Sequence, residues 1–120
     1  MGKKILIVED DPVNSKLIQA NLDKEGYETV AAMDGEVGLQ KVQEDRPDLI
    51  ILDVEMPRMN GYTFITQLNK MVEKKIPVIV LTAHSDMQPI FQLNGVRTYL
   101  VKPVDFEKLY ESIVKCLSED

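Results

Sequence analysis

The chain has 120 residues, 44% of them apolar, so it is long enough for one domain and too rich in core-forming residues to be disordered. Its formal net charge of −6 argues against a surface that binds nucleic acid or anionic lipid, and no apolar run approaches a membrane-spanning length. With a single cysteine, Cys116, and no apolar run typical of a signal peptide, we expect one soluble, cytoplasmic domain that spans residues 1–120.

The first strand is expected at residues 5–8, where four apolar residues follow one another. A helix is expected after it, because Asp11 suits an N-cap, Pro12 suits the first helical position and Gly26 suits a stop. The apolar residues of this segment recur at helical intervals and predict the buried face of the helix: Val13, Leu17, Ile18 and Leu22.

The rest of the chain continues this alternation of strands and helices. Further strands are expected at four apolar runs, namely residues 29–32, 49–52, 77–81 and 99–101. Three further helices are predicted from apolar stripes: Val37, Leu39 and Val42; Phe64, Ile65, Leu68 and Val72; and, after an Asp105 cap, Phe106, Leu109, Tyr110, Ile113, Val114 and Leu117. Between residues 86 and 94 a helix can only be short, because Pro89 belongs near a helix start and Gly95 favours a stop. Uninterrupted apolar strands that alternate with helices predict an α/β fold, with a parallel sheet covered by helices on both faces.

Polar side chains follow the predicted strands at their carboxyl ends. In a parallel α/β sheet these ends form one edge, and ligands bind there. The residues expected at this edge are Glu9, Asp10 and Asp11 after the first strand, Asp53 after the third, Thr82 after the fourth and Lys102 after the fifth. Any one of them could be an ordinary polar strand end, and Asp11 could be only a helix cap. Together, however, three or four crowded carboxylates repel one another and need a cation or a proton.

A hard divalent cation, Mg²⁺ or Mn²⁺, would offset this charge. Mg²⁺ takes oxygen ligands and is usually bound by one or two carboxylates together with phosphate oxygens. Asp10 and Asp53 would supply the carboxylates, and Glu9 would act directly or through water. A phosphoryl group on Asp53 would then be neutralised by the cation, by the Lys102 ammonium and by the Thr82 hydroxyl. The acidic edge therefore predicts metal-dependent phosphoryl transfer to Asp53.

These motifs, in this order, resemble the receiver domain of two-component response regulators over essentially the whole chain. The resemblance implies a flavodoxin-like sheet of five parallel strands in the order 2-1-3-4-5. It also implies that Asp53 accepts a phosphoryl group from a sensor histidine kinase or a phosphotransfer protein, and that the chain then signals to a downstream protein target or output domain. Such a chain is a signalling module in a phosphorelay, with self-catalysed transfer but no turnover of an external substrate. The motifs are Ile7-Val8-Glu9-Asp10-Asp11, Leu52-Asp53-Val54-Glu55-Met56-Pro57, Asn60-Gly61, Leu81-Thr82-Ala83 and Lys102-Pro103.

The resemblance further implies a role for single residues around the metal ion. Glu9 and Asp10 match the acidic pair of the family, and the backbone carbonyl of Glu55 would complete the metal shell with Asp53. The peptide bond that joins Lys102 to Pro103 is typically cis in the family.

The switch implied by the resemblance consists of Thr82 and Tyr99. In the family the hydroxyl moves toward the phosphoryl group, and the aromatic side chain follows into the space that it leaves. Glu55 and His84 stand two residues beyond Asp53 and Thr82, at variable positions of the family that tune hydrolysis of the aspartyl phosphate. We hypothesise that these two side chains approach each other and alter the phosphoryl lifetime; the alternative is that both face water.

One segment departs from the family pattern. The stretch from Thr82 to Lys102 is slightly shorter than expected and contains Pro89. In the family this region carries output contacts and the contacts of phosphorylation-dependent dimers. We therefore expect such a dimer only as a general property of the family, without a particular mode.

Two other functions remain open from the residues. A small phosphatase of the haloacid dehalogenase type uses a similar set, which Asp53, Glu55, Thr82 and Lys102 approximate. It is opposed because the second acid is normally Asp, because the metal-binding acids normally follow the lysine, and because 120 residues leave little room for a cap over a substrate. A flavodoxin-like flavin carrier is opposed because no Ser/Thr/Gly-rich loop follows the first strand, where the acidic cluster would repel a flavin phosphate.

Overall fold

The computed structural model describes residues 3–54, 61–83 and 96–118. In these ranges strands and helices follow one another in the expected order. The elements are β1 (Lys4–Val8), α1 (Pro12–Lys24), β2 (Glu28–Ala32), α2 (Gly35–Asp45), β3 (Leu49–Asp53), α3 (Gly61–Met71), β4 (Val78–Thr82), β5 (Val96–Val101) and α5 (Phe106–Ser118).

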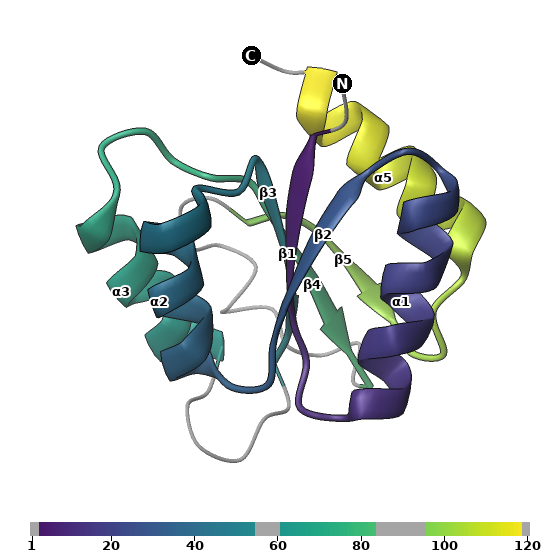
Figure 1. Cartoon of the computed structure of the whole chain (residues 1–120), viewed down its shortest axis with the longest axis horizontal. Coiled ribbons are helices and arrows are strands. Elements are labelled where there is room, and N and C mark those ends of the chain that lie inside the picture. The colour runs from purple at the N-terminus through teal and green to yellow at the C-terminus, as the bar shows by residue number, and fades with distance from the viewer. Residues whose placement is uncertain (1–2, 55–60, 84–95, 119–120) are drawn as a thin grey trace.

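The described strands form one parallel sheet in the order β2-β1-β3-β4-β5 (Figure 1). This is the order that the resemblance implied, and the prediction is confirmed. The register pairs Val8 with Leu52 and Leu52 with Val80. The carboxyl ends of the central strands therefore lie at the same level, along the lower edge of the sheet in Figure 1.

Helices cover both faces of the sheet, with α1 and α5 on one side and α2 and α3 on the other (Figure 1). Because successive strand residues point to opposite faces, Ile5 and Ile7 of β1 pack with α1 and α5, whereas Leu6 and Val8 pack with α2 and α3. The same alternation holds in β3 and β4, which are buried along their whole length. This double burial explains the uninterrupted apolar runs in the sequence.

The backbone of α2 lies very close to the sheet and to α3 at Gly38. Gly38 of α2 lies against the sheet and α3, and a Cβ placed on it would come within 3.0 Å of Phe64 Cε1 and 3.1 Å of Val8 Cγ2. Phe64 and Val8 are both fully buried. Glycine is thus the residue that lets α2 approach this closely.

The predicted helix ends are confirmed by their hydrogen bonds. Asp11 caps α1, since its Oδ1 accepts from the Val13 N–H at 2.9 Å, and Pro12 is the first helical residue. Asp105 caps α5 in the same way, with its Oδ1 accepting from the Glu107 N–H at 3.0 Å. Gly26, just after α1, has the positive φ of 92° that favours glycine.

The buried face predicted for the first helix is wrong in part. α1 buries Ser15, Ile18 and Leu22, whereas Val13 is 72% exposed and Leu17 is 51% exposed. Successive helical residues are rotated by about 100°, so a face centred on Ile18 turns its neighbour Leu17 outward. In α5 the apolar stripe is likewise too wide, because Val114 is 58% exposed.

The element boundaries also differ in detail from the prediction. β5 begins at Val96 rather than at Tyr99, and β3 and β4 extend one residue beyond their apolar runs, to Asp53 and Thr82. The short helix expected between residues 86 and 94 lies outside the described residues. In the part of the chain that the structure describes, no helix combines the length and the apolar character needed to cross a membrane.

Candidate functional site

Four strand ends bring the predicted site residues to one edge of the sheet. Asp53 and Thr82 end the adjacent strands β3 and β4, Glu9 and Asp10 directly follow β1, and Lys102 directly follows β5. The sheet ladder continues one step into this edge, because the Lys102 N–H donates to the Thr82 carbonyl at 2.8 Å. The backbone therefore fixes the starting point of each side chain.

Three carboxylates gather at this edge. Glu9, Asp10 and Asp53 each offer a carboxylate oxygen, and these oxygens lie within 4.8 Å of one another. Glu9 and Asp53 are each only 2% exposed. Carboxylates at such separations repel strongly when water is excluded, so the site needs a cation or a proton.

The two oxygens of the Glu9 carboxylate have different surroundings. Oε2 accepts from the Asp11 N–H at 3.1 Å, which fixes the orientation of the group. Oε1 is buried and accepts no hydrogen bond from the described residues. A buried carboxylate oxygen without a donor is the kind of atom that a hard cation binds, so this donor set fits Mg²⁺ or Mn²⁺.

The pKa of the Glu9 carboxyl is raised to about 8, first by burial and then by the Asp53 carboxyl, which can share a proton with it. The Asp11 N–H and the Lys102 ammonium act in the opposite direction and lower this pKa. In the metal-free protein, Glu9 therefore keeps its proton to a higher pH than an ordinary carboxyl group does. A cation that binds here has to displace it.

Lys102 provides the positive charge of the site. Its Nζ donates to Asp53 Oδ2 at 2.9 Å, and the Lys102 side chain keeps 25% of its surface exposed while Asp53 is almost fully buried. The Lys102–Pro103 peptide bond is cis, as the resemblance implied. The predicted proximity of this ammonium to Asp53 is thus confirmed.

Thr82 and Tyr99 have clear places in the fold. Thr82 is fully buried at the end of β4, next to β3. Tyr99 of β5 is half-buried and packs against the core cluster on the α2 and α3 side of the sheet. Their role as a switch stays a prediction. Glu55, with its backbone carbonyl, and His84 lie outside the described residues.

The acidic cluster contains three of the four carboxylates that the sequence places at this edge. Asp11 is exposed, and its carboxylate caps α1. The reading of Asp11 as a helix cap, which the sequence left open, is therefore correct. The acid groups that meet are Glu9, Asp10 and Asp53.

The sequence missed a cleft of about 440 Å³ beside Lys102. Leu17 of α1 and Phe106 of α5 line it from two helices, together with Pro103 and Val104. The apolar spacing of the first helix predicts Leu17 on its buried face. A polar residue on the inward face, Ser15, was the feature that could have shifted the predicted face of α1 and shown Leu17 to be exposed.

Comparisons with known proteins agree with this geometry. Residues 5–114 match the family model of the response regulator receiver domain. The chain is 34% identical to sporulation initiation phosphotransferase F of Bacillus subtilis, over 98% of the chain and 95% of that protein. It is 37% identical to transcriptional regulatory protein GlrR of Escherichia coli over 96% of the chain, but spans only 26% of that protein's length.

The fold is also found among solved structures. The receiver domain of sensor histidine kinase PA1611 from Pseudomonas aeruginosa superposes with a TM-score of 0.88 at 29% identity, over 99% of this chain and 100% of that one. That structure holds a magnesium ion coordinated in its active site cleft.

Proposed function

The chain belongs to the response regulator receiver domain family of two-component signalling, and we propose that Asp53 is the residue on which it accepts the phosphoryl group. One observation supports this assignment above the others. Asp53 is buried between the carboxylates of Glu9 and Asp10 and an ammonium, that of Lys102, at 2.9 Å. A carboxylate placed between a cation-binding group and a fixed positive charge can accept a phosphoryl group without a large rearrangement of the charged groups around it.

The reaction transfers a phosphoryl group from a phosphohistidine of the partner. A carboxylate oxygen of Asp53 attacks phosphorus, the bond between phosphorus and the histidine nitrogen breaks, and its electron pair stays on that nitrogen. Glu9 and Asp10 would hold Mg²⁺ together with Asp53 and the Glu55 carbonyl, and the ion would neutralise the transferred oxygens. Lys102 orients the carboxylate through Oδ2 and stays to balance the new charge.

We propose that Thr82 and Tyr99 transmit the phosphorylated state. The Thr82 hydroxyl is buried at the end of the strand next to β3, so a short movement would bring it to an oxygen of the phosphoryl group. The half-buried ring of Tyr99 would then occupy the vacated space. Glu55 and His84 are proposed to set the phosphoryl lifetime.

The partner that supplies the phosphoryl group is proposed to be a sensor histidine kinase or a phosphotransfer protein. Val13 and Leu17 of α1 are apolar and exposed, and Leu17 lines the cleft beside Lys102. An apolar surface next to the phosphorylation site suits the docking of such a partner. A downstream protein target or output domain would then respond, with a phosphorylation-dependent dimer as a further outcome.

The test is incubation with acetyl phosphate and Mg²⁺, followed by mass spectrometry of the intact chain. One acyl phosphate per chain, abolished by EDTA, is expected, with little turnover of small phosphate esters. Sustained hydrolysis of such esters without a stable acyl phosphate would instead favour the haloacid dehalogenase type of phosphatase.

A further inference from the structure

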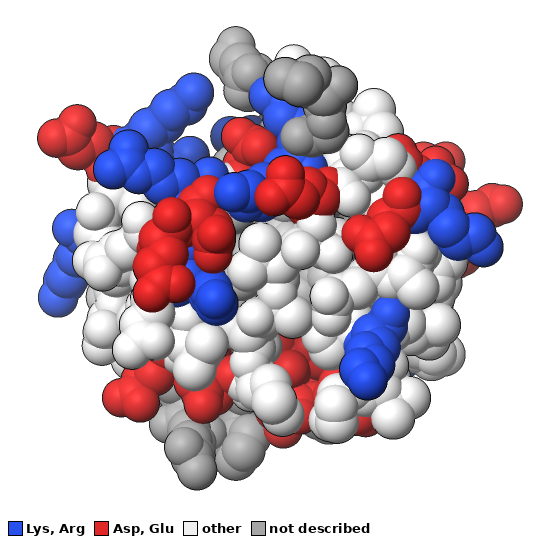
Figure 2. Space-filling model, viewed as in Figure 1, with Lys and Arg blue, Asp and Glu red and all other residues white. Residues whose placement is uncertain are grey.

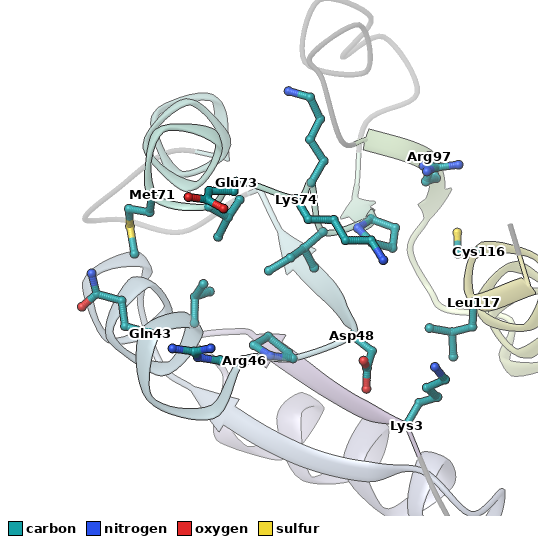
Figure 3. Close-up of a pocket in the computed structure, with 16 residues that line it drawn as sticks. Lys3, Gln43, Arg46, Asp48, Met71, Glu73, Lys74, Arg97, Cys116 and Leu117 are labelled. Atoms are coloured by element: carbon teal, nitrogen blue, oxygen red, sulfur yellow. The ribbon is translucent and has the colours of Figure 1, made fainter. Parts of the chain in front are cut away.

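A second and larger cleft lies at the other end of the sheet, where the strands begin. It has a volume of about 840 Å³ (Figure 3). Residues from the connections that precede β3 and β4 line one side, and Arg97, Cys116 and Leu117 line the other. Asp53 ends β3 while Asp48 precedes it, so the length of the strand, on the order of 15 Å, separates this cleft from the phosphorylation site.

The charge of this cleft is opposite to that of the chain. The chain has a net charge of −6, yet cationic side chains outnumber acidic ones in the lining. Figure 2 shows Lys and Arg side chains mixed with Asp and Glu side chains in the upper half of the molecule, toward the end where the strands begin, so the excess of cations belongs to the cleft lining and not to the whole face. One of the two lining carboxylates is already engaged, because Asp48 Oδ2 accepts from the Lys4 N–H at 2.8 Å. The cations are Lys3, Arg46, Lys74, Lys75 and Arg97, and the acids are Asp48 and Glu73.

Arg46 occupies a backbone position that does not favour arginine. It follows α2 in the left-handed conformation, with φ 48° and ψ 65°, where glycine or asparagine is usual. The helix end itself needs only the backbone, since the Arg46 N–H donates to the Val42 carbonyl at 3.1 Å. A residue that is unfavourable for the backbone and yet lines a cleft points to a use for its side chain.

The ends of the helices explain only part of this charge. α2, α3 and α5 all end at this cleft, and the partial negative charge of their last carbonyls attracts cations. Lys3, however, precedes β1 and Arg97 lies within β5, so these two cations come from segments other than the helix ends. Between the cations the lining is apolar, with Val72, Ile76 and Leu117 half-buried in it.

This combination selects among anionic ligands. A compact phosphate group would leave the apolar side chains between the cations uncovered. Carboxylates spread along an extended chain suit cations that come from separate segments, and apolar side chains between them suit the apolar floor. We propose that the cleft binds an acidic peptide segment, with apolar residues between its carboxylates, from a partner protein.

The test uses fluorescein-labelled synthetic peptides built from Glu and Leu at varied spacing, with fluorescence polarisation as the readout. Binding to the parent chain is expected, and it should weaken as salt is added. The double variant Arg46→Glu/Lys74→Glu should bind about tenfold more weakly or worse. The single variant Arg46→Gly fits the left-handed backbone, so it removes the cation without strain and should weaken binding without loss of stability.

The controls separate this site from general charge effects. Lys16→Glu/Lys108→Glu changes the net charge equally at exposed positions outside the cleft and should bind like the parent. Peptides with Gln in place of Glu should not bind. The proposal is overturned if no Glu/Leu peptide binds, if both double variants lose binding equally, or if ATP and tripolyphosphate bind in the cleft more tightly than the peptides. Labelling of Asp53 by acetyl phosphate does not involve the cleft, so a variant that is still labelled at Asp53 is folded.

Discussion

Lys102 reaches Asp53 across an intervening strand. Its Nζ donates to Asp53 Oδ2 at 2.9 Å, although Lys102 follows β5, Asp53 ends β3, and β4 lies between them. The lysine is therefore held by β5 and by its backbone bond to Thr82, the last residue of the strand that it crosses. This arrangement places a fixed positive charge opposite the carboxylates that follow β1.

Replacing Lys102 by Met should slow labelling of the chain by acetyl phosphate about a hundredfold, because a preorganised charge opposite the developing charge is lost. Binding of Mg²⁺ should persist, since the three carboxylates remain. Lys108→Met, at an exposed position of α5, is the matched control and should label like the parent. A Lys102→Met chain that labels at the parental rate would remove the lysine from the mechanism.

The affinity for Mg²⁺ should depend on pH through Glu9. Its pKa is about 8 in the metal-free protein, so the affinity should fall by about tenfold for each pH unit below that value, as a proton competes with the ion. Glu9→Gln should bind Mg²⁺ more weakly at high pH and lose this dependence. Isothermal titration at several pH values measures both effects. An affinity of the parent that stays flat as the pH falls below 8 would contradict the assignment.

The stability of the metal-free chain should also change with pH. The pKa of Glu9 is raised from 4.5 to about 8, so the folded state binds more protons than the unfolded state between these values. The free energy of unfolding should therefore decrease as the pH rises from 4.5 to 8, and no further contribution from Glu9 should remain above 8. Urea unfolding in EDTA is the measurement, and Glu9→Gln should flatten the curve. Stability that rises with pH in this range, equally in both chains, would show that Glu9 ionises normally.

The exposed apolar face of α1 can be separated from the chemistry. Val13→Asp/Leu17→Asp should leave labelling by acetyl phosphate unchanged, but should slow transfer from a phosphorylated histidine kinase that labels the parent, by about tenfold or more. Val114→Asp is a matched control, since Val114 is 58% exposed but lies on α5. Equal transfer rates for all three chains would exclude this face from docking.

Because α2 approaches the sheet closely at Gly38, even the methyl group of alanine should destabilise the fold there. Gly38→Ala should lower the free energy of unfolding by about 1–3 kcal/mol, because the new methyl group meets Phe64 and Val8 in a filled core. Alanine favours the helix by up to about 1 kcal/mol, which reduces but does not cancel the loss. Gln40→Ala, at an exposed position of α2, should have little effect. A variant as stable as the parent would show that α2 can shift at no cost.

The sequence predicted most of the sheet because its strands carry an unambiguous pattern. The runs at residues 5–8 and 49–52 are apolar throughout, and strands buried on both faces are the structures that need this. The polar residues at the strand ends followed from the topology alone, since parallel strands end at one edge. The meeting of Glu9, Asp10 and Asp53 was therefore accessible before any coordinates.

The features that could not be predicted from the sequence depend on packing between segments that are far apart in the chain. In α1 the apolar residues allowed two overlapping faces, and only the contact with the sheet selects the one through Ser15 and Ile18. The raised pKa of Glu9 requires its burial, which no local pattern encodes. The cleft around Arg46 forms where three helix ends meet, far apart in the sequence.

The most direct test of the account is the location of the phosphoryl group. The parent chain and Asp53→Asn should be incubated with acetyl phosphate and Mg²⁺, reduced with borohydride to trap the acyl phosphate, and mapped by tandem mass spectrometry. The account predicts a single modified residue, Asp53, in the parent and no acyl phosphate in Asp53→Asn. Equal modification of Asp53→Asn, or a parent chain modified only elsewhere, would contradict it.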